Sequence, residues 1–304
     1  MTACGFVAVV GAPNAGKSTL VNALVGAKVA IVSPKVQTTR MNVRGVVVRG
    51  ETEIVLVDTP GIFVPKRTLD KAMVAAAWGG AGDADAVIVL VDAEDVTLRP
   101  NGPAARDTMR VIEGLKSSGR RAALVLNKID TMPRDKLLPL IERFNAEGIF
   151  DEIFPISALK GDGLNGLADW CAARMPAGPW LYPEDQTADI PSRVLAAEIT
   201  REKIYIRLHD ELPYATAVET EKWEERKDGS VKIDQIIYVH RDGQKKIMLG
   251  KNGSVIRAVG EAARREMEAI FDRKVHLFLF VKVSENWDEN RSHYRQIGLE
   301  FPGK

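Results

Sequence analysis

The sequence predicts an α/β fold in which a doubly wound, mostly parallel sheet is followed by a smaller α+β domain. Short apolar runs, the first over residues 6–10, alternate with helical patterns through the first half, as is typical of parallel sheets covered on both faces. A Gly-rich turn follows the first run. A Pro-rich stretch near residue 180 ends the alternation, and the length of 304 residues leaves room for a second domain.

Composition excludes several classes of protein. Hydrophobic residues make up 45% and charged residues 27% of the chain, which is ordinary for a globular protein. The net charge of +1 gives no bulk attraction to nucleic acid, so any such partner needs a local patch. Cys4 and Cys171 are too few for a disulfide framework or a Cys-rich metal site. No secretory leader or long apolar stretch is present, so we expect a cytoplasmic protein.

The Gly-rich turn separates the first strand from a predicted helix over 19–25. Gly11 and Gly16 permit backbone angles at which successive N–H groups converge on an anion at a helix N-terminus. Lys17 is placed to reach the outer phosphates, and the Ser18 hydroxyl can bind a magnesium ion that bridges them. A turn that binds nothing is disfavoured because the pattern has its strand before and its helix after. The predicted nucleotide contacts are Gly11, Ala12, Pro13, Asn14, Ala15, Gly16, Lys17, Ser18 and Thr19.

Two strand-like runs, 43–48 and 53–57, form a predicted hairpin that ends at Asp58. A carboxylate there, followed by a turn that frees a Gly N–H, suits a magnesium partner and a γ-phosphate sensor. Thr38 and Thr39 precede the hairpin, and paired hydroxyls in a loop are either solvated turn residues or metal ligands. The predicted nucleotide contacts of the Asp58 turn are Asp58, Thr59, Pro60, Gly61 and Ile62.

Two further strands are predicted over 86–92 and 122–126, separated by a helix over 106–115. Asp92 ends the first of them, and we interpret it as a strand-end cap rather than a catalytic group. The second runs into the sequence NKID. Its Asp130 carboxylate can accept two hydrogen bonds from the ring N–H and exocyclic amine of guanine, a donor pair that adenine lacks.

The last turn of this half lies between a strand over 149–156 and a helix over 164–175. Its backbone can contact the base from the side opposite NKID, while Asn127 can tie NKID to the Gly-rich turn and the Lys128 stem can cover the base. All these turns follow strands, so we expect them at the carboxyl edge of one sheet. The predicted base contacts are Asn127, Lys128, Asp130, Ser157, Ala158 and Leu159.

The motifs GAPNAGKS, DTPG, NKID and SAL, in this order, resemble the family of translation-factor-related P-loop GTPases over the first half of the chain. The resemblance implies Mg²⁺ as a cofactor and favours Thr39 over Thr38 as the switch threonine. It implies catalytic roles for Lys17, Thr39 and Gly61 and metal binding by Ser18 and Thr39, with Asp58 just outside the direct ligands.

Two positions of this half bear on the hydrolysis rate. Ile62 stands where a Ras-like GTPase has a glutamine that orients the attacking water, so we expect slow unaided hydrolysis. Asn14 is shared with relatives that use a potassium ion as an extra charge in the transition state. We therefore hold a K⁺ at Asn14 as a hypothesis.

A linker rich in Pro and acidic residues is expected between two domains. Beyond it, apolar spacing predicts a helix over 191–209, followed by strands over 214–223 and 231–240. A terminal amphipathic helix is expected over 286–297. The expected boundaries are 1–178 for the first domain, 179–190 for the linker and 191–304 for the second domain.

The Gly-x-x-Gly sequence from Gly250 to Gly253 lies between a short apolar turn and a helix over 254–271, with a strand over 276–283 after it. Its glycines let the loop approach a nucleic-acid backbone, and an apolar floor can receive unstacked bases. A structural helix–turn–helix can use the same glycines, but this order of elements is similar to the KH family in its bacterial type II topology. The expected RNA contacts are Lys245, Lys246, Ile247, Gly250, Lys251, Asn252, Gly253, Ile256, Arg257 and Arg264.

Across its whole length the chain resembles the Era family of bacterial ribosome-assembly GTPases, including the segments QTTR and VLAAEITREKIYIRLHDELPY. Asn252 departs from the family loop, which often has glycine there. The resemblance implies binding of GTP and GDP, nucleotide-switched binding to the 3′ end of 16S rRNA in the 30S subunit, a monomer, and peripheral contact with the cytoplasmic face of the membrane.

Two functions other than a nucleotide-switched, RNA-binding GTPase are also compatible with parts of the sequence. The first is a nucleotide-dependent transferase with a C-terminal substrate domain, which the guanine-reading NKID turn and the lack of a second catalytic constellation disfavour. The second is an RNA-binding module whose nucleotide site is a relic. Intact Lys17, Ser18, Asp58 and Asp130 disfavour it.

Overall fold

The computed structural model describes residues 1–302, apart from the side chains of Ser292 and Gln296. It divides into a first unit of Met1–Ala30 and Thr39–Asp189 and a second unit of Ile31–Thr38 and Ile190–Phe301. The division differs from the expected boundaries in two respects. The short segment Ile31–Thr38 belongs to the second unit, and residues 179–189 of the expected linker belong to the first. Residues 303 and 304, the end of the expected second domain, lie outside the described residues. No helix within 1–302 is long and apolar enough to cross a membrane.

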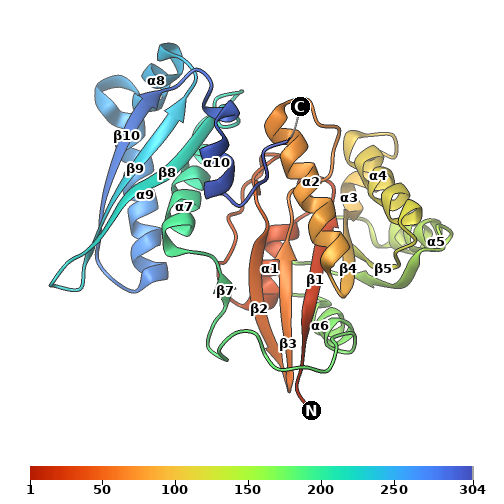
Figure 1. Cartoon of the computed structure of the whole chain (residues 1–304). Coiled ribbons are helices and arrows are strands. Elements are labelled where there is room, and N and C mark those ends of the chain that lie inside the picture. Colours follow the sequence, from red (N-terminus) through yellow and green to blue (C-terminus); the bar gives the residue numbers. More distant parts are fainter. Residues whose placement is uncertain (303–304) are drawn as a thin grey trace. The chain divides into compact units, whose positions relative to one another are not determined.

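Within the described residues, the first unit is built on a seven-stranded sheet in the order β6-β5-β4-β1-β3-β2-β7 (Figure 1). Strand β2 runs antiparallel to β3, and β7 antiparallel to β2, while the other neighbours are parallel. The predicted mostly parallel, doubly wound sheet is thus confirmed. The strands are β1 (Ala3–Gly11), β2 (Val43–Arg49), β3 (Thr52–Asp58), β4 (Ala86–Asp92), β5 (Ala122–Asn127), β6 (Phe150–Pro155) and β7 (Ala188–Asp189).

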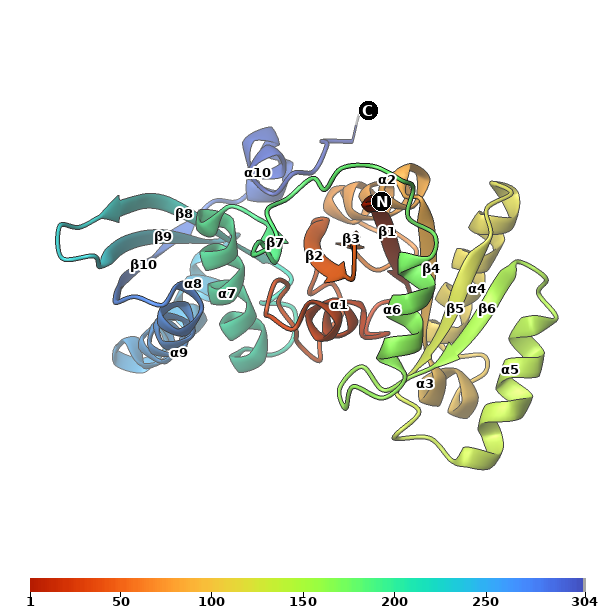
Figure 2. The same ribbon diagram turned by 90° about the horizontal axis from the view of Figure 1, so that it is seen from below.

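Helices cover both faces of this sheet (Figure 2). Helices α2, α4 and α5 contribute to the apolar core on one face, and α1 and α6 to the core on the other. Because both faces are covered, the central strands are apolar at nearly every position, and β5 is buried throughout. The helices are α1 (Lys17–Val25), α2 (Thr68–Asp83), α3 (Ala93–Leu98), α4 (Pro103–Ser117), α5 (Leu137–Asn145) and α6 (Leu164–Ala172).

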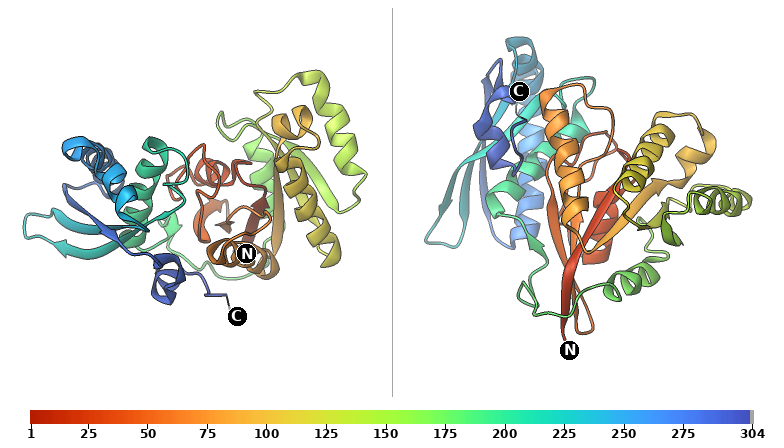
Figure 3. Two further views of the ribbon diagram at one scale, coloured as in Figure 1. Left: turned by 90° about the horizontal axis from the view of Figure 1, so that it is seen from above. Right: turned by 45° about the vertical axis from the view of Figure 1, so that its right-hand side comes forward.

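The second unit is built on a three-stranded sheet in the order β10-β9-β8, with β8 antiparallel and β10 parallel to β9 (Figure 3). Helices α7 and α9 pack on one face, and α10 lies on the other, where the rings of His293 and Tyr238 are 4.8 Å apart. The predicted KH-like order is confirmed. The elements are α7 (Ser192–Arg207), β8 (Thr216–Glu225), β9 (Val231–Val239), α8 (Asp242–Leu249), α9 (Ser254–Phe271), β10 (Val275–Val283) and α10 (Arg291–Gln296).

Candidate functional site

The Gly-rich turn links β1 to α1, and its lysine is drawn inward. Lys17 is only 6% exposed, and its Nζ donates to the carbonyls of Ala12 at 2.9 Å and Gly11 at 3.2 Å. Burial lowers the pKa of Lys17 to about 8, with the Asp58 charge opposing the shift. The ammonium thus sits inside the loop itself, within reach of any anion that the loop's N–H groups hold.

Three oxygen-bearing side chains meet beside this lysine. Ser18 Oγ lies 2.6 Å from Asp58 Oδ2 and 2.8 Å from Thr39 Oγ1. Asp58 is fully buried, and burial raises its pKa to about 6. Among the described residues its Oδ1 has no hydrogen-bond partner. A buried, unpartnered carboxylate oxygen beside two hydroxyls is a donor set that suits a hard divalent cation.

The two adjacent threonines have different surroundings. Thr39 is the one beside Ser18 and Asp58, whereas the Thr38 hydroxyl pairs with Ser33 at 2.6 Å and donates to the Lys35 carbonyl at 2.7 Å. No three His, Cys, Asp or Glu side chains gather into a metal-binding group within 1–302.

The Asp58 turn lies against the Gly-rich loop with no room for a side chain at Gly61. A Cβ there would come within 2.9 Å of the Pro13 ring. The Ile62 N–H donates to the Gly11 carbonyl at 3.1 Å, and the Thr59 hydroxyl to the Val9 carbonyl at 2.7 Å. The Ile62 side chain is fully buried in the apolar core of the first unit, so it offers no group to solvent.

The NKID turn is fastened to the Gly-rich loop by Asn127. Its Nδ2 donates to the Ala15 carbonyl at 2.9 Å, and its Oδ1 accepts from the Ala158 N–H at 3.0 Å. The hydrogen bond of Ser157 lowers the pKa of Asp130 and keeps that carboxylate ionised. The Leu159 side chain is 82% exposed, so the turn fixes the backbone of this residue but does not bury its side chain. One amide therefore joins three segments that are far apart in the sequence.

Two residues that the sequence did not predict as part of the site, Asp92 and Lys160, pair with predicted site residues. Lys128 Nζ donates to the Asn14 carbonyl at 2.9 Å and forms an ion pair with Asp92. Asp92, which was expected to cap the end of a strand, caps the N-terminus of helix α3 by accepting from the Asp95 N–H at 3.0 Å. Lys160 Nζ lies 3.4 Å from Asp130, and its position directly after SAL was the available signal.

The Gly-x-x-Gly loop of the second unit is a short 3₁₀ turn, η2 (Lys251–Gly253), between α8 and α9. Gly250, Asn252 and Gly253 all have positive φ, a region that Asn tolerates better than most residues. Lys251 and Asn252 are exposed. The loop therefore offers its backbone and one lysine to solvent.

The expected RNA contacts around this loop are not equivalent. Ile247 is 57% exposed, whereas Ile256 packs against the apolar core. Arg264 is paired with Glu268 at 3.0 Å along α9. Four other cations among the expected RNA contacts, Lys245, Lys246, Lys251 and Arg257, form no ion pair within the described residues.

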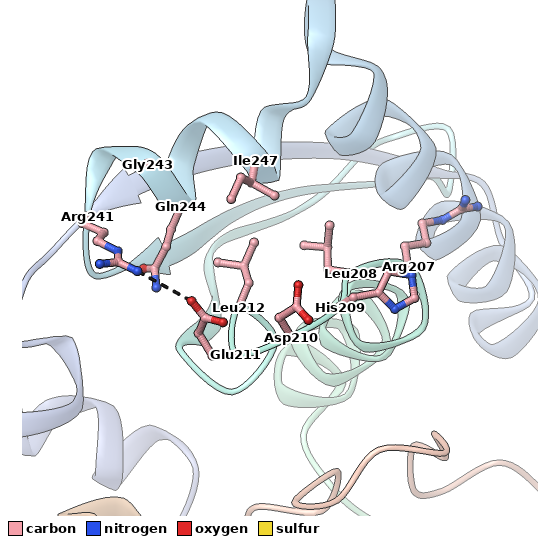
Figure 4. A pocket seen from close by; sticks show the side chains of 10 residues that line it. All are labelled: Arg207, Leu208, His209, Asp210, Glu211, Leu212, Arg241, Gly243, Gln244 and Ile247. Atoms are coloured by element: carbon pink, nitrogen blue, oxygen red, sulfur yellow. Dashed lines mark ion pairs between the residues drawn. The ribbon is translucent and has the colours of Figure 1, made fainter.

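A cavity of about 590 Å³ lies beside α8 in the second unit (Figure 4). Leu208, Leu212 and Ile247 supply apolar walls, and Arg241 and Glu211 form an ion pair of 3.6 Å at its edge. Its lining residues are Arg207, Leu208, His209, Asp210, Glu211, Leu212, Arg241, Gly243, Gln244 and Ile247.

Comparison with protein families matches both halves. Residues 6–128 match the model described as 50S ribosome-binding GTPase, and residues 211–288 match the KH domain model. The chain is 56% identical to GTPase Era of Maricaulis maris, covering 98% of this chain and 97% of that protein. It is also 56% identical to GTPase Era of Brucella suis, covering 99% of this chain and 94% of that protein.

Solved structures give the same result. A crystal structure of a variant of Aquifex aeolicus Era bound to GDP and AlF4⁻ has a TM-score of 0.89 at 38% identity, covering 98% of this chain and 99% of that one. A crystal structure of Era in complex with MgGDPNP and nucleotides 1506–1542 of 16S ribosomal RNA has a TM-score of 0.89 at 37% identity, with the same coverage.

Proposed function

The chain belongs to the GTPase Era family, and from this premise we propose that it is a nucleotide-switched assembly factor of the small ribosomal subunit. Its enzymatic activity is hydrolysis of GTP to GDP and phosphate. The observation that carries the proposal is the presence in one chain of a guanine-nucleotide site and a Gly-x-x-Gly RNA loop.

Mg²⁺ is the proposed cofactor. Ser18 and Thr39 would supply hydroxyl ligands, and Asp58 would act just outside them. The proposal rests on the mutual distances of 2.6 and 2.8 Å and on the unpartnered Oδ1 of Asp58 within the described residues. Bound Mg²⁺ neutralises phosphate charge as it develops.

The protein's own groups would perform the remaining tasks of the nucleotide site. Lys17 would neutralise phosphate charge from inside the loop, and the Gly61 N–H would donate a hydrogen bond to the γ-phosphate. The Asp130 carboxylate would select guanine by accepting hydrogen bonds from the ring N–H and the exocyclic amine of the base. Asn127 would hold the NKID turn against the Gly-rich loop. With Ile62 buried, no side chain at that position would orient water, so unaided hydrolysis would be slow.

A potassium ion at Asn14 is the finer part of this proposal. Asn14 has φ of 61° in the Gly-rich loop, and its carbonyl accepts from Lys128. A monovalent cation there would add positive charge close to the phosphates and stabilise the charge that builds up between them in the transition state.

The proposed RNA is the 3′ end of 16S rRNA, bound by the KH unit within the 30S subunit. Support comes from the related Era crystallised with nucleotides 1506–1542 of 16S ribosomal RNA. The backbone from Gly250 to Gly253, which has positive φ at every residue except Lys251, would contact the RNA backbone. Lys251 would contact the RNA phosphates, and Ile247 would contact an unstacked base. From the family resemblance we further propose a cytoplasmic monomer that contacts the inner membrane peripherally.

The test is crosslinking of the full chain to an RNA of the 16S 3′ end with GDP or with a non-hydrolysable GTP analogue and Mg²⁺. The nucleotide switch predicts different crosslinking yields in the two states, because a ligand shifts a conformational equilibrium only by its differential affinity. Equal yields would contradict the switch, and no crosslink in either state would contradict the RNA assignment. A poly(A) RNA of equal length is the matched control.

A further inference from the structure

The segment Ile31–Thr38 belongs to the second unit although it lies between two stretches of the first. Within the second unit it is bound along helix α7. The Val32 N–H donates to Glu202 Oε1 at 2.8 Å, and the Tyr205 hydroxyl donates to the Gln37 carbonyl at 3.4 Å. Gln37 has φ of 57°, a strained angle that persists where surrounding contacts fix it.

Two cations make the remaining contacts. Lys35 Nζ donates to the carbonyls of Tyr205 and Leu208, at the end of α7 where helix carbonyls lack partners of their own. Arg201 is 2% exposed, pairs with Glu198, and donates to the Thr38 carbonyl. The segment is therefore fixed on α7 at its middle and at its last residue.

The residue that follows this clamped segment is Thr39. Its hydroxyl lies in the first unit, 2.8 Å from Ser18 Oγ. Consecutive Cα atoms are only about 3.8 Å apart, so a fixed Thr38 carbonyl restricts where the Thr39 hydroxyl can go. Contacts that orient the Thr38 carbonyl therefore also restrict the backbone of Thr39, the residue whose hydroxyl meets Ser18.

We propose that Lys35 and Arg201 are positioning residues of the GTPase reaction, which hold Ile31–Thr38 on helix α7 so that Thr39 is presented to the magnesium ion. The inference rests on the proposed function, because it takes Ser18 and Thr39 as the metal ligands. Neither cation touches the nucleotide in this scheme. They act through the backbone that carries Thr39.

The clamp lies next to a cavity of the second unit. Leu208, whose carbonyl accepts from Lys35, lines the cavity beside α8, the helix that runs into the Gly-x-x-Gly loop (Figure 4). A change in the cavity wall at Leu208 can thus alter the clamp without any contact to the nucleotide.

The test compares the Mg²⁺ dependence of GTP hydrolysis in the full-length wild type and four full-length variants. Lys35 is only partly buried, so Lys35→Met removes its charge with little risk to folding. Lys35→Arg is the conservative variant. Arg193→Met is the matched control, because Arg193 lies on the same helix but donates to the carbonyls of Thr220 and Glu221 in β8.

Loss of a hydrogen bond to a charged group corresponds to roughly a tenfold effect. We expect Lys35→Met to raise the half-saturating Mg²⁺ concentration for GTP hydrolysis and to lower kcat, each by about that factor, with the Kd for GDP changed less than about twofold. Lys35→Arg and Arg193→Met should behave as wild type. This split would not follow from a general loss of stability.

Wild-type Mg²⁺ dependence in Lys35→Met would overturn the inference, as would an equal loss in Arg193→Met. A wild-type chain that hydrolyses GTP equally well without Mg²⁺ would instead overturn the proposed metal role on which the inference rests. Arg201→Lys, which keeps a cation opposite Glu198, should reproduce the Mg²⁺ shift in weaker form.

Discussion

Asn127 donates a hydrogen bond of 2.9 Å to the carbonyl of Ala15, across 112 positions of sequence. Its other amide atom accepts from Ala158 at 3.0 Å. Through this one buried side chain the NKID turn, the Gly-rich loop and the turn of Ser157 to Leu159 keep a fixed spacing, which the proposed recognition of both ends of one nucleotide requires.

Removing this side chain should damage both folding and binding. Asn127→Ala leaves the Ala15 carbonyl and the Ala158 N–H without their partner, at a cost of roughly 1–3 kcal/mol for each buried group. We expect a free energy of unfolding lower by at least about 2 kcal/mol and a Kd for GDP raised at least tenfold, measured by urea unfolding and nucleotide titration. Asn145→Ala, at an exposed helix end, is the control. Unchanged GDP affinity would disprove the joining role.

A methyl group at Gly16 should have a similar effect from the opposite side. Gly16 has φ of 99°, and a Cβ there would lie 2.4 Å from Asn127 Nδ2. Because neither the backbone nor the amide can yield cheaply, we expect Gly16→Ala to weaken GDP binding by at least tenfold. Gly79→Ala, in α2 with open space around it, should bind GDP normally. Normal binding by both variants would mean that the loop is more adaptable than its contacts indicate.

The buried carboxylate of Asp58 should make the nucleotide-free protein sensitive to pH. Its folded pKa of about 6 is above the unfolded value of 3.8, so its stabilising contribution is present below pH 3.8 and is lost as pH rises through 6. At pH 7.5 the buried charge therefore costs up to about 3 kcal/mol.

Asp58→Asn removes this cost, so the variant's Tm without nucleotide should exceed that of wild type at pH 7.5, with the difference shrinking toward pH 4. Adding Mg²⁺ and a GTP analogue should raise the Tm of wild type only. Thermal scans at both pH values measure this. A variant that is less stable at pH 7.5 would indicate that the bonds from Ser18 and Thr39 already compensate the charge.

The proposed potassium site predicts faster GTP hydrolysis in potassium than in sodium buffer at equal ionic strength. Asn14→Gly should abolish the difference, because glycine accepts the φ of 61° without strain while removing the amide. Phosphate release at several cation concentrations measures the effect. Identical wild-type rates in the two buffers would remove the potassium hypothesis and leave the magnesium proposal intact.

Lys251 should contribute to RNA binding through a phosphate contact. We expect Lys251→Ala to weaken binding to the 16S 3′ end several-fold and to lower the slope of log K against log salt by about 1, because one counterion fewer is released. The control is Lys227→Ala, an exposed lysine in the turn between β8 and β9, which should leave affinity and slope unchanged. An equal effect of both variants would indicate non-specific attraction. Arg264→Ala should have a smaller effect, since Arg264 is already paired with Glu268.

The sequence alone determined the fold class, the guanine-nucleotide site and the presence of an RNA loop. Each depends on residues that are close together in the chain, where a strand, a turn and a helix follow one another and only certain residue types perform the chemistry. The tie from Asn127 to the Gly-rich loop was predicted for the same reason. Helices α2 and α5 were not placed. The Ala- and Gly-rich α2 carries little helical spacing of its own and is selected by packing on the sheet, whereas α5 buries Leu140 and Phe144 at helical spacing, a signal that the sequence did contain.

Tertiary structure decided what the spacing left open. Thr38 and Thr39 are chemically equivalent neighbours, and only the approach of β3 and α1 places Thr39 beside Ser18 and Asp58. The clamp of Lys35 and Arg201 on helix α7 joins residues more than 160 positions apart, as shown by the separation of Arg201 from Thr38. Burial and packing bring such partners together, and no local pattern in the sequence records them.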